Sequence, residues 1–382
     1  MEYIRLEQCA KYSDKRTKNI LLESYISTEN MIPNKGGISI AESIPDCKSA
    51  SKYESQDILL SNIRPYFRKI WYANREGSCS NDVLVLKTQT GFYSKFLYFV
   101  LSDNNFFNYD TVTSKGTKMP RGSKKAIMKY LVPNFNLSKQ HHIASILSAY
   151  DNLIENNYRR IRLLEQMAEN LYKEWFAYHK IKDVSAEVRL TDIVSINRGL
   201  SYSSEEIECE DGNDLINLKN IQAYGGFRLD GTKKYNGKYK KEQVVQESDL
   251  IMGVTDMTQD RRTVGSVALI PNISTLSVIS ADLIKLNSEI DNVYLYAMFR
   301  WGNVSKYISQ FANGANVLHL RPKVLRNVKV LLPQKSLIDK FVFIVKPMIM
   351  TINKLNTENE NLSRQRDLLL PRLMSGKLEV NV

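Results

Sequence analysis

The sequence holds little of what metal sites and disulfide frameworks require. Only four cysteines and four histidines occur among 382 residues. The cysteines are too far apart for a CxxC metal knuckle, so we expect them to be reduced and structural. The histidines also lack metal-ligand spacing, which predicts ordinary exposed or hydrogen-bonded side chains and no metal site. The residues concerned are Cys9, Cys47, Cys79, Cys209, His141, His142, His179 and His319.

Long apolar runs are also missing. No stretch of 18 or more apolar residues exists, and the start MEYIRLEQ lacks the charged-then-apolar order of a signal peptide. With 43% hydrophobic and 25% charged residues, the composition is typical of a soluble globular protein. We therefore expect neither membrane insertion nor secretion, and a cytoplasmic location.

Catalytic signatures are absent as well. The sequence contains no G-x-G-x-x-G after a strand, no Walker A motif, no H-E-x-x-H and no G-x-S-x-G. A nuclease pattern would need a lysine where Gln56 follows Glu54, and the tetrapeptide of adenine methyltransferases does not occur. These absences predict a protein that binds and does not itself catalyse.

Positive charge, in contrast, is plentiful. The net charge is +12 and the pI is near 9.3, which favours a polyanionic partner because Lys and Arg along phosphates release condensed counterions. Residues 1–133 hold 20 Lys and Arg against 13 Asp and Glu, whereas residues 183–333 hold 18 of each. The first segment should therefore bind phosphate more strongly, unless the second gathers its cations on one face.

The chain repeats itself after about two hundred residues. YLVP at 130–133 matches VLLP at 330–333, and SNDVLVLK at 80–87 matches SADLIKLN at 280–287, both at an offset of 200. FLYFVLS at 96–102 matches YLYAMFR at 294–300, and Gly116 matches Gly314, both at an offset of 198. Four matches in one order predict two copies of a globular unit, each followed by a long helix.

Within each copy the pattern is mixed. Short β-branched and apolar runs predict strands at 57–63, 82–87, 244–254 and 266–270. Apolar spacings of three and four predict one helix per copy, at 93–108 and 292–311.

Two long heptad patterns follow the copies. They begin at Ile143 and at Phe341, and they predict two helices that pair in antiparallel fashion. Each carries one asparagine in its seam, Asn157 or Asn359, which is expected to fix the register at some cost in stability. Amphipathic helices packed on separate domains are the alternative. Pro347 is expected to kink or delay the second helix and Pro371 to end it. The predicted seam comprises Ile143, Leu147, Tyr150, Ile154, Asn157, Ile161, Leu164, Leu171, Ile352, Leu355, Asn359, Leu362 and Leu369.

Candidate DNA-binding residues lie mainly in basic loops. Arg can fork to guanine O6 and N7, amides suit adenine N6 and N7, and Lys supplies a point charge to phosphate. The loop before each long helix is cationic in the first copy and amide-bearing in the second. The candidates are Arg64, Tyr66, Arg68, Lys69, Lys115, Lys118, Arg121, Lys124, Lys125, Lys219, Arg228, Lys233, Lys234, Arg261, Arg262, Asn313, Asn316, His319, Arg321 and Lys323.

Taken together, several stretches resemble the specificity (S) subunits of type I restriction-modification systems. They are DILLSNIRPYFRK with SNDVLVLK, GTKMPRGSKKAIMKYLVP, the helix HHIASILSAYDNLIENNYRRIRLLEQMAENLYKEWF and the ending LSRQRDLLLPRLMSGKLEV. The resemblance covers nearly the whole chain and is weakest from Asn197 to Ala281.

The resemblance implies an α+β fold of two mixed α/β target recognition domains joined by two long antiparallel coiled-coil helices, as a pseudo-twofold internal repeat. It implies recognition domains at 1–133 and 183–333 and conserved helical regions at 134–182 and 334–382. Each domain would read half of a bipartite double-stranded DNA site. Two modification subunits would methylate adenine N6 with S-adenosylmethionine, and restriction subunits with ATP and magnesium could join. The chain itself would bind no cofactor.

Two other readings stay open at this point. A stand-alone DNA methyltransferase or nuclease is the enzymatic alternative, against which the missing motifs count. A coiled-coil scaffold is the other, since heptads alone support it, although a scaffold leaves the repeated basic loops unexplained.

Overall fold

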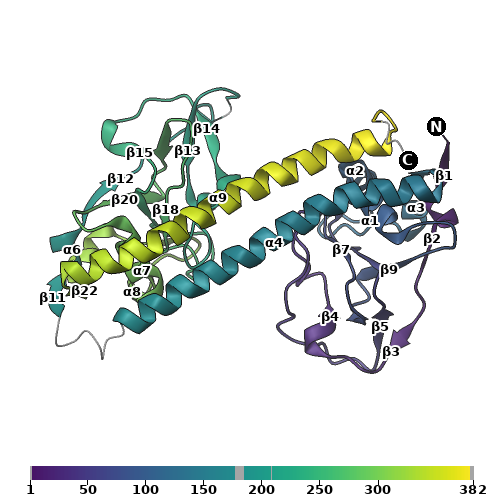
Figure 1. Cartoon of the computed structure of the whole chain (residues 1–382), viewed down its shortest axis with the longest axis horizontal. Helices are drawn as coiled ribbons and strands as arrows, with labels where there is room; N and C mark the ends of the chain where they lie inside the picture. Colours follow the sequence, from purple (N-terminus) through teal and green to yellow (C-terminus); the bar gives the residue numbers. More distant parts are fainter. Residues whose placement is uncertain (1, 177–184, 208, 379–382) are drawn as a thin grey trace. The chain divides into compact units, whose positions relative to one another are not determined.

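The computed structural model describes residues 2–176, 185–207 and 209–378. The chain forms two compact units: unit 1 is Met1–Glu155 with Glu360–Val382, and unit 2 is Asn156–Asn359. Each unit takes one end of both long helices, α4 (Leu137–Phe176) and α9 (Lys335–Met374) (Figure 1). The predicted linear division into recognition domains and helical regions stays a prediction, and its boundary at 182 lies outside the described residues.

Unit 1 is built on a four-stranded antiparallel sheet in the order β2-β9-β6-β7. The two central strands are buried on both faces, and their side chains alternate between two core clusters. Ile58 and Leu60 point to the cluster that includes the helices, while Leu59 and Val85 point to the other. The strands are β2 (Ala10–Tyr12), β6 (Ile58–Ser61), β7 (Ile70–Tyr72) and β9 (Val83–Thr88).

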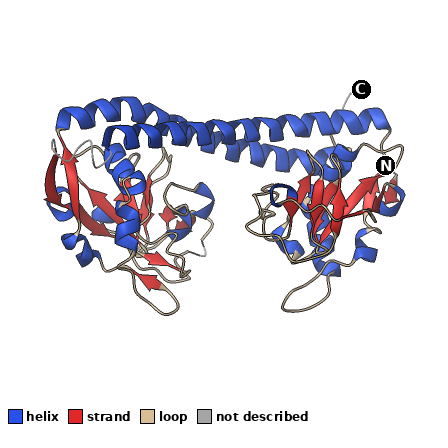
Figure 2. Ribbon diagram, turned by 90° about the horizontal axis from the view of Figure 1, so that it is seen from below, coloured by secondary structure: helices blue, strands red, loops and turns tan. Residues whose placement is uncertain are grey.

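A second sheet of unit 1 has the order β3-β5-β8-β4, and the strands β1 and β10 pair at the two ends of residues 3–133. Helices lie against these sheets (Figure 2). The elements are β1 (Tyr3–Arg5), β3 (Arg16–Thr17), β4 (Tyr25–Ile26), β5 (Ala50–Tyr53), β8 (Gly77–Cys79), β10 (Leu131–Pro133), α1 (Ser94–Ser102), α2 (Asn104–Thr113), α3 (Lys124–Ile127) and the 3₁₀ turns η1 (Leu6–Gln8), η2 (Leu22–Ser24) and η3 (Pro65–Phe67).

Unit 2 repeats the first sheet in the order β12-β20-β16-β18, again fully antiparallel. The side chains of its central strand β16 also alternate between two clusters. Leu250 and Met252 belong to the main core, and Ile251 belongs to a smaller cluster. The strands are β12 (Ser195–Arg198), β16 (Leu250–Gly253), β18 (Val267–Leu269) and β20 (Leu283–Asn287).

The second sheet is where the copies diverge. In unit 1 the central pair β5 and β8 is antiparallel, whereas in unit 2 the central pair β13 and β19 is parallel. The remaining elements of unit 2 are β11 (Ser185–Arg189), β13 (Asn213–Ile216), β14 (Lys233–Tyr235), β15 (Val244–Val245), β17 (Thr255–Asp256), β19 (Ser277–Ile279), β21 (Leu318–His319), β22 (Lys329–Pro333), α6 (Leu190–Ile193), α7 (Asn292–Trp301), α8 (Val304–Ser309), η4 (Leu218–Asn220), η5 (Leu229–Gly231), η6 (Lys241–Gln243) and η7 (Pro322–Asn327).

The prediction of one helix per copy is wrong, because each predicted segment holds two helices: α1 and the start of α2 within 93–108, and α7 and α8 within 292–311. Asp103 is extended and its carboxylate accepts a hydrogen bond from the Asn105 amide at 2.7 Å, so it ends α1 and caps α2. In unit 2, Asn303 adopts a left-handed conformation with φ 63° and separates α7 from α8. The predicted strand at 244–254 is likewise two strands, β15 and β16.

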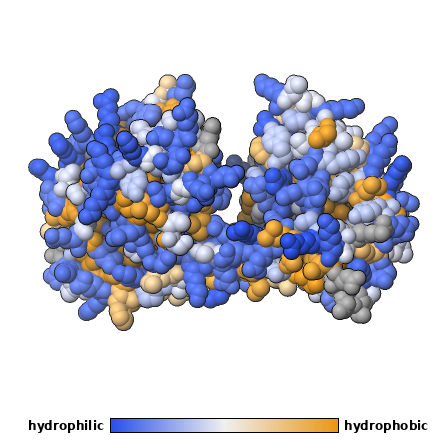
Figure 3. Space-filling view, turned by 90° about the horizontal axis from the view of Figure 1, so that it is seen from above, coloured by the Kyte–Doolittle hydropathy of each residue, from blue (hydrophilic) through white to orange (hydrophobic). Residues whose placement is uncertain are grey.

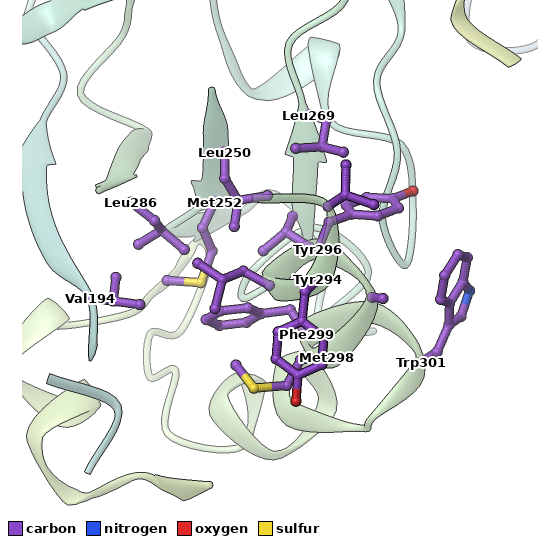
Figure 4. Packing of buried hydrophobic residues seen from close by; sticks show 14 of the residues in the cluster. Val194, Leu250, Met252, Leu269, Leu286, Tyr294, Tyr296, Met298, Phe299 and Trp301 are labelled. Atoms are coloured by element: carbon purple, nitrogen blue, oxygen red, sulfur yellow. The ribbon is translucent and has the colours of Figure 1, made fainter. Parts of the chain in front are cut away.

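Helix α7 forms the centre of the unit 2 core. Tyr294, Met298 and Phe299 of this helix share one buried cluster with Leu250 and Met252 of the sheet (Figure 4). The ends of the long helices join the same core through an aromatic cluster. Here the ring centroids of Phe176 and Phe341 are 5.1 Å apart.

The long helices are antiparallel within each unit. In unit 1, Ile143 and Leu147 of α4 share a core cluster with Leu370 and Leu373 of α9. Arg366 of α9 pairs there with Asp151 of α4 at 2.7 Å. Of the predicted seam residues, the buried ones are Ile143, Leu147, Asn157, Ile161, Ile352, Leu355 and Asn359, and the half-buried ones are Tyr150, Ile154, Leu164, Leu171, Leu362 and Leu369.

Both proline predictions for α9 need correction. The helix begins at Lys335, so Pro347 does not delay it, and the alternative of a kink at Pro347 stays a prediction. The helix continues through Pro371 to Met374, so Pro371 does not end it. The carbonyl that Pro347 deprives of a donor belongs to Phe343 on the exposed side of the helix, where water can replace the lost bond.

Two asparagines are buried among apolar seam residues of unit 2. Asn157 is 5% exposed and Asn359 is 3% exposed. The amide nitrogen of Asn157 and both polar side-chain atoms of Asn359 have no hydrogen-bond partner among the described residues. A buried polar group without a partner costs about 1–3 kcal/mol. Their predicted role, fixing the helix register at a cost in stability, stays a prediction.

This cost can be measured. Replacing both residues (Asn157→Leu with Asn359→Leu) should raise the free energy of unfolding in urea by about 2 kcal/mol, because two unsatisfied amides leave the interior. Asn361→Leu, at an exposed position of the same helix, should change it by less than about 0.5 kcal/mol. A destabilised double variant would mean that the two amides satisfy each other in solution.

Cysteines and histidines are ordinary in the described residues. All four cysteines are free, and burial raises the pKa of the Cys9 and Cys79 thiols to about 12. His141 stacks on Tyr93 at 3.9 Å, and His179 lies outside the described residues. No group of three acidic, His or Cys side chains in residues 2–176, 185–207 and 209–378 could hold a metal ion. None of the helices described there is long and apolar enough to cross a membrane.

Candidate nucleic-acid interface

One short hairpin recurs in each unit with the same hydrogen bonds. In hairpin 1 (residues 115–121) the backbones of Lys115 and Arg121 exchange two bonds of 2.9 and 2.8 Å. In hairpin 2 (residues 313–319) Asn313 and His319 do the same at 3.1 and 2.9 Å. The two matching loop sequences therefore form the same backbone structure, once in each unit.

The repeated glycine has a physical reason. Gly116 has φ 98° and Gly314 has φ 156°, conformations that other residues adopt only with strain. A Cβ on Gly314 would also lie 1.9 Å from the carbonyl oxygen of Val317. Each hairpin consequently needs glycine at its second position, whatever side chains surround it.

Each hairpin is anchored to the segment that follows the central strand of the first sheet. The Gly122 amide donates to the Asn62 carbonyl at 3.0 Å, and the Leu320 amide donates to the Val254 carbonyl at 2.8 Å. Ile63 then pairs with Arg121, as Thr255 pairs with His319. A second loop, residues 64–69 in unit 1 and 257–263 in unit 2, therefore lies beside each hairpin.

In unit 1 these two loops gather positive charge. The Arg64 amide donates to the Pro120 carbonyl at 2.8 Å, which places Arg64 next to the hairpin that carries Lys115, Lys118 and Arg121. Arg121 pairs with Asp82 at 3.2 Å but stays exposed. Lys124 and Lys125 follow directly in α3, also exposed, and Ser123 caps that helix through its hydroxyl.

Two other basic side chains of the 64–69 loop donate hydrogen bonds to the protein itself. Tyr66 is exposed, whereas Lys69 donates to the Thr28 carbonyl at 2.6 Å and burial lowers its pKa. Arg68 donates to the side-chain oxygen of Asn104 at 3.1 Å. Lys69 and Arg68 therefore hold the loop in place, and the exposed members of the predicted set are the better placed to reach a ligand.

In unit 2, hairpin 2 carries amide side chains, and Asp256 anchors the loop beside it. Burial raises the pKa of Asp256, but hydrogen bonds from the amides of Thr263 and Thr258 outweigh it and hold this pKa below its usual value. Asp256 thereby fixes the loop that carries Arg261 and Arg262, where Arg262 pairs with Asp260 at 2.6 Å.

Hairpin 2 itself presents polar side chains. Asn313, Asn316 and His319 are exposed on it, and Arg321 and Lys323 follow at the start of η7. The side chain of Gln259 donates to the Ala315 carbonyl at 2.9 Å and joins the two loops.

Four predicted cations of unit 2 lie elsewhere, on the second sheet and its connections. Arg228 pairs with Asp230 at 2.6 Å, and Lys234 pairs with Asp214 at 3.0 Å. Lys233 lies 5.8 Å from the centroid of the Tyr202 ring, and Lys219 is exposed in η4. The structure thus brings together the hairpin residues with the loops beside them, and it ties three of these four cations to protein groups of the second sheet and its connections.

Sequence reasoning missed Asp256, Gln259 and the buried residues under hairpin 1. The Asp-Met-Thr order offers a signal for Asp256, because an Asp side chain often bonds the amide two residues on in a turn. Gln259 gives no such signal, since its partner is more than fifty residues away.

The exposed surface agrees with a polar ligand. Hydrophilic residues cover most of the face seen in Figure 3, and hydrophobic residues form scattered patches on it. The arrangement of a cationic hairpin in one unit and an amide-bearing hairpin in the other can contact phosphates and base edges.

Comparison with known proteins points the same way. Residues 7–166 match the family described as type I restriction modification DNA specificity domain. The type I restriction enzyme MjaIX specificity subunit of Methanocaldococcus jannaschii is 24% identical over 311 residues, covering 76% of this chain and 70% of that protein. The HindI specificity subunit of Haemophilus influenzae is 21% identical over 431 residues, covering 93% and 94%.

A solved structure shares the fold. The crystal structure of a type I restriction-modification system S subunit from M. genitalium superposes with a TM-score of 0.57 at 15% sequence identity, covering all of this chain and 96% of that one. The predicted α+β architecture with long helices and an internal repeat is thereby confirmed.

Proposed function

Residues 7–166 belong to the type I restriction modification DNA specificity domain family, and from this premise we propose that the chain is the DNA-reading subunit of a type I restriction-modification complex. Its two units each read one half of a bipartite double-stranded site in the major groove. The observation that carries this proposal is the same hairpin in both units, closed by the same backbone bonds but with different side chains. Two recognition units with the same backbone and different side chains suit a bipartite site, whose two halves differ in base sequence.

The chemistry then belongs to other chains. The relatives are named specificity subunits, and this chain carries no catalytic motif of its own. We expect two modification subunits to dock on the long helices and to methylate adenine N6 with S-adenosylmethionine. Restriction subunits using ATP and magnesium can join them. Such a complex acts on cellular DNA, so the expected location is the cytoplasm.

The test is a methylome. The chain is expressed in a host together with its partner modification subunit, and methylated adenines are mapped by single-molecule sequencing. The expected result is one new bipartite motif with a non-specific spacer. No new motif, or methylation by the purified chain alone with S-adenosylmethionine, would overturn the proposal.

Lys118 at the tip of hairpin 1 offers a measurement of phosphate contact. Lys118→Ala should weaken binding to every duplex and lower the slope of log K against log salt concentration by about 1, because one phosphate contact releases about 0.9 counterion. Lys329→Ala removes an exposed lysine that pairs with Glu187 away from the hairpins, and it should leave the slope unchanged. Equal slopes for wild type and Lys118→Ala would place Lys118 off the phosphates.

A further inference from the structure

A group of hydrogen-bond acceptors without donors lies under hairpin 1. Asp110 of α2 is 0% exposed and Asn62 is 8% exposed. Both carboxylate oxygens of Asp110 and the side-chain oxygen of Asn62 lack a partner among the described residues. Gly122, the residue after the hairpin, borders the same space: a Cβ there would lie 2.5 Å from Asp110 Oδ1 and 3.1 Å from Asn62 Oδ1.

The second unit fills the equivalent positions differently. Val254 corresponds to Asn62 and Leu320 to Gly122, because the same backbone hydrogen bond joins each pair. At the offset of 198 that relates Gly122 to Leu320, Asp110 corresponds to Ile308. Ile308, Val254 and Leu320 are all buried members of the unit 2 core. The fold therefore does not require polar groups here, and their presence in unit 1 asks for a separate reason.

The three oxygens need at least one donor. A buried, unpaired carboxylate is costly, so a buried acid of this kind takes up a proton and becomes neutral. A neutral carboxyl supplies the missing donor itself, and the amide oxygen of Asn62, which borders the same space beside Gly122, is an acceptor without a partner among the described residues. That bond would tie α2 to the segment on which hairpin 1 is anchored.

We propose that Asp110 is a positioning residue for hairpin 1: as a neutral carboxylic acid it donates its proton to Asn62 and holds the anchoring segment against Gly122, so that DNA binding by unit 1 takes up a proton. This inference rests on the proposed function, since it assigns Asp110 to the hairpin that reads DNA. Asp110 acts through Asn62 and does not itself touch the duplex.

Burial raises the pKa of Asp110 to about 7, which agrees with this geometry. The titratable and charged groups on the elements around it include Lys11 and Tyr12 of β2, Tyr66 of η3 with Arg64 and Arg68 beside it, Lys95 and Tyr98 of α1, Lys124 and Lys125 of α3, and Arg121 with its partner Asp82. Burial raises the pKa of Tyr12, so Tyr12 stays neutral at neutral pH. Arginine and lysine side chains keep their charge between pH 6 and 8.

The sign of the pH dependence follows from that pKa. The folded-state pKa of Asp110 lies above the unfolded value, so the neutral form is the one that the fold favours, and it is lost as pH rises through about 7. Hairpin 1 is ordered only while Asp110 is neutral. The neutral fraction of Asp110 falls about tenfold between pH 6 and pH 8, so the affinity for DNA falls by the same factor.

The first measurement needs no DNA. In protein labelled with ¹³C at the aspartate carboxyls, the resonance that is missing from Asp110→Asn should titrate near pH 7. Titration at the ordinary aspartate value would show an ionised Asp110 that draws its donors from water or a cation, and would overturn the inference. This outcome is separate from the proposed function, which fails only if wild type binds no bipartite duplex at any pH.

The second measurement is duplex affinity from pH 6 to 8. Asp110→Asn keeps the size and a donor for Asn62 without a charge, so it should bind like wild type at pH 6 and change by less than about threefold up to pH 8. Asp14→Asn, which neutralises an exposed carboxylate of the same unit, should keep the wild-type tenfold fall.

A third protein guards against a folding defect. The combination Asn62→Val, Asp110→Ile and Gly122→Leu copies the unit 2 arrangement and should bind with a flat pH profile. An Asp110→Asn protein whose affinity falls as steeply as that of wild type would show that Asp110 fills space only.

Discussion

Exchanging hairpin 1 for the sequence of hairpin 2 is expected to lower the affinity for the original DNA site by about 100-fold while the fold remains intact, since each mismatched base pair costs roughly 1–3 kcal/mol. The exchange keeps Gly116 and consists of Lys115→Asn, Thr117→Ala, Lys118→Asn, Met119→Val, Pro120→Leu and Arg121→His. The measurement is the methylated motif together with the dissociation constant for the original duplex.

The physical reason lies in what each hairpin can donate and accept. Cationic side chains fork to the guanine acceptors, whereas amides pair with the donor and acceptor of adenine. The bonds that close and anchor hairpin 1 come from backbone groups, including that from the Arg64 amide to the Pro120 carbonyl, so they survive the exchange. The first half of the motif should therefore change and the second half should not.

The reciprocal exchange in hairpin 2 is the matched control. It should change the other half of the motif and leave the first half as it was. A motif that stays the same in both proteins would mean that bases are read by other loops, and the hairpins would then serve only to hold them.

Much of this architecture was open to prediction because it depends on local patterns. The repeated Gly116 and Gly314 mark a backbone conformation that only glycine adopts easily, so the match survived although the side chains around it changed. The buried runs of β6 and β16 mark central strands covered on both faces. The heptads predicted both long helices.

The breaks inside elements were harder to foresee. Asp103 ends one helix and caps the next, yet the apolar spacing of three and four continues across it. The same spacing hides the turn at Asn303. For Pro347 the sequence predicted a delayed helix start that the structure does not have. A proline on the exposed side of a long helix costs one hydrogen bond, which water can replace.

The candidate site was predictable only as a set of loops. Sequence shows that Lys69 and Lys234 are basic, but their acceptors, Thr28 and Asp214, lie far along the chain. Nothing local distinguishes a lysine held by protein from one free to meet a phosphate. The same limit hid Asp110, whose importance comes from Asn62 and Gly122 and from the apolar residues of the other unit.

The second prediction of large effect concerns the proposed docking of modification subunits. On α9, Phe343 is 82% exposed and Met350 is 56% exposed, and their separation of seven residues puts them on one helix face. Single exposed apolar side chains are common, but large ones that share one helix face form the kind of patch found at protein interfaces. Both belong to unit 2, opposite the seam residues that face its core.

Replacing both residues (Phe343→Ser with Met350→Ser) should weaken binding to the modification subunit by about 100-fold, because central apolar anchors each contribute roughly 2 kcal/mol or more at an interface. Their exposure means that the free energy of unfolding should change by less than about 0.5 kcal/mol.

Ile40→Ser, at an exposed aliphatic residue of unit 1, controls for the loss of surface hydrophobicity and should bind like wild type. Isothermal titration with the purified modification subunit measures all three proteins. Wild-type affinity in the double variant would place the docking surface on another part of the helices, whereas its selective loss would separate partner docking on α9 from DNA reading by the hairpins.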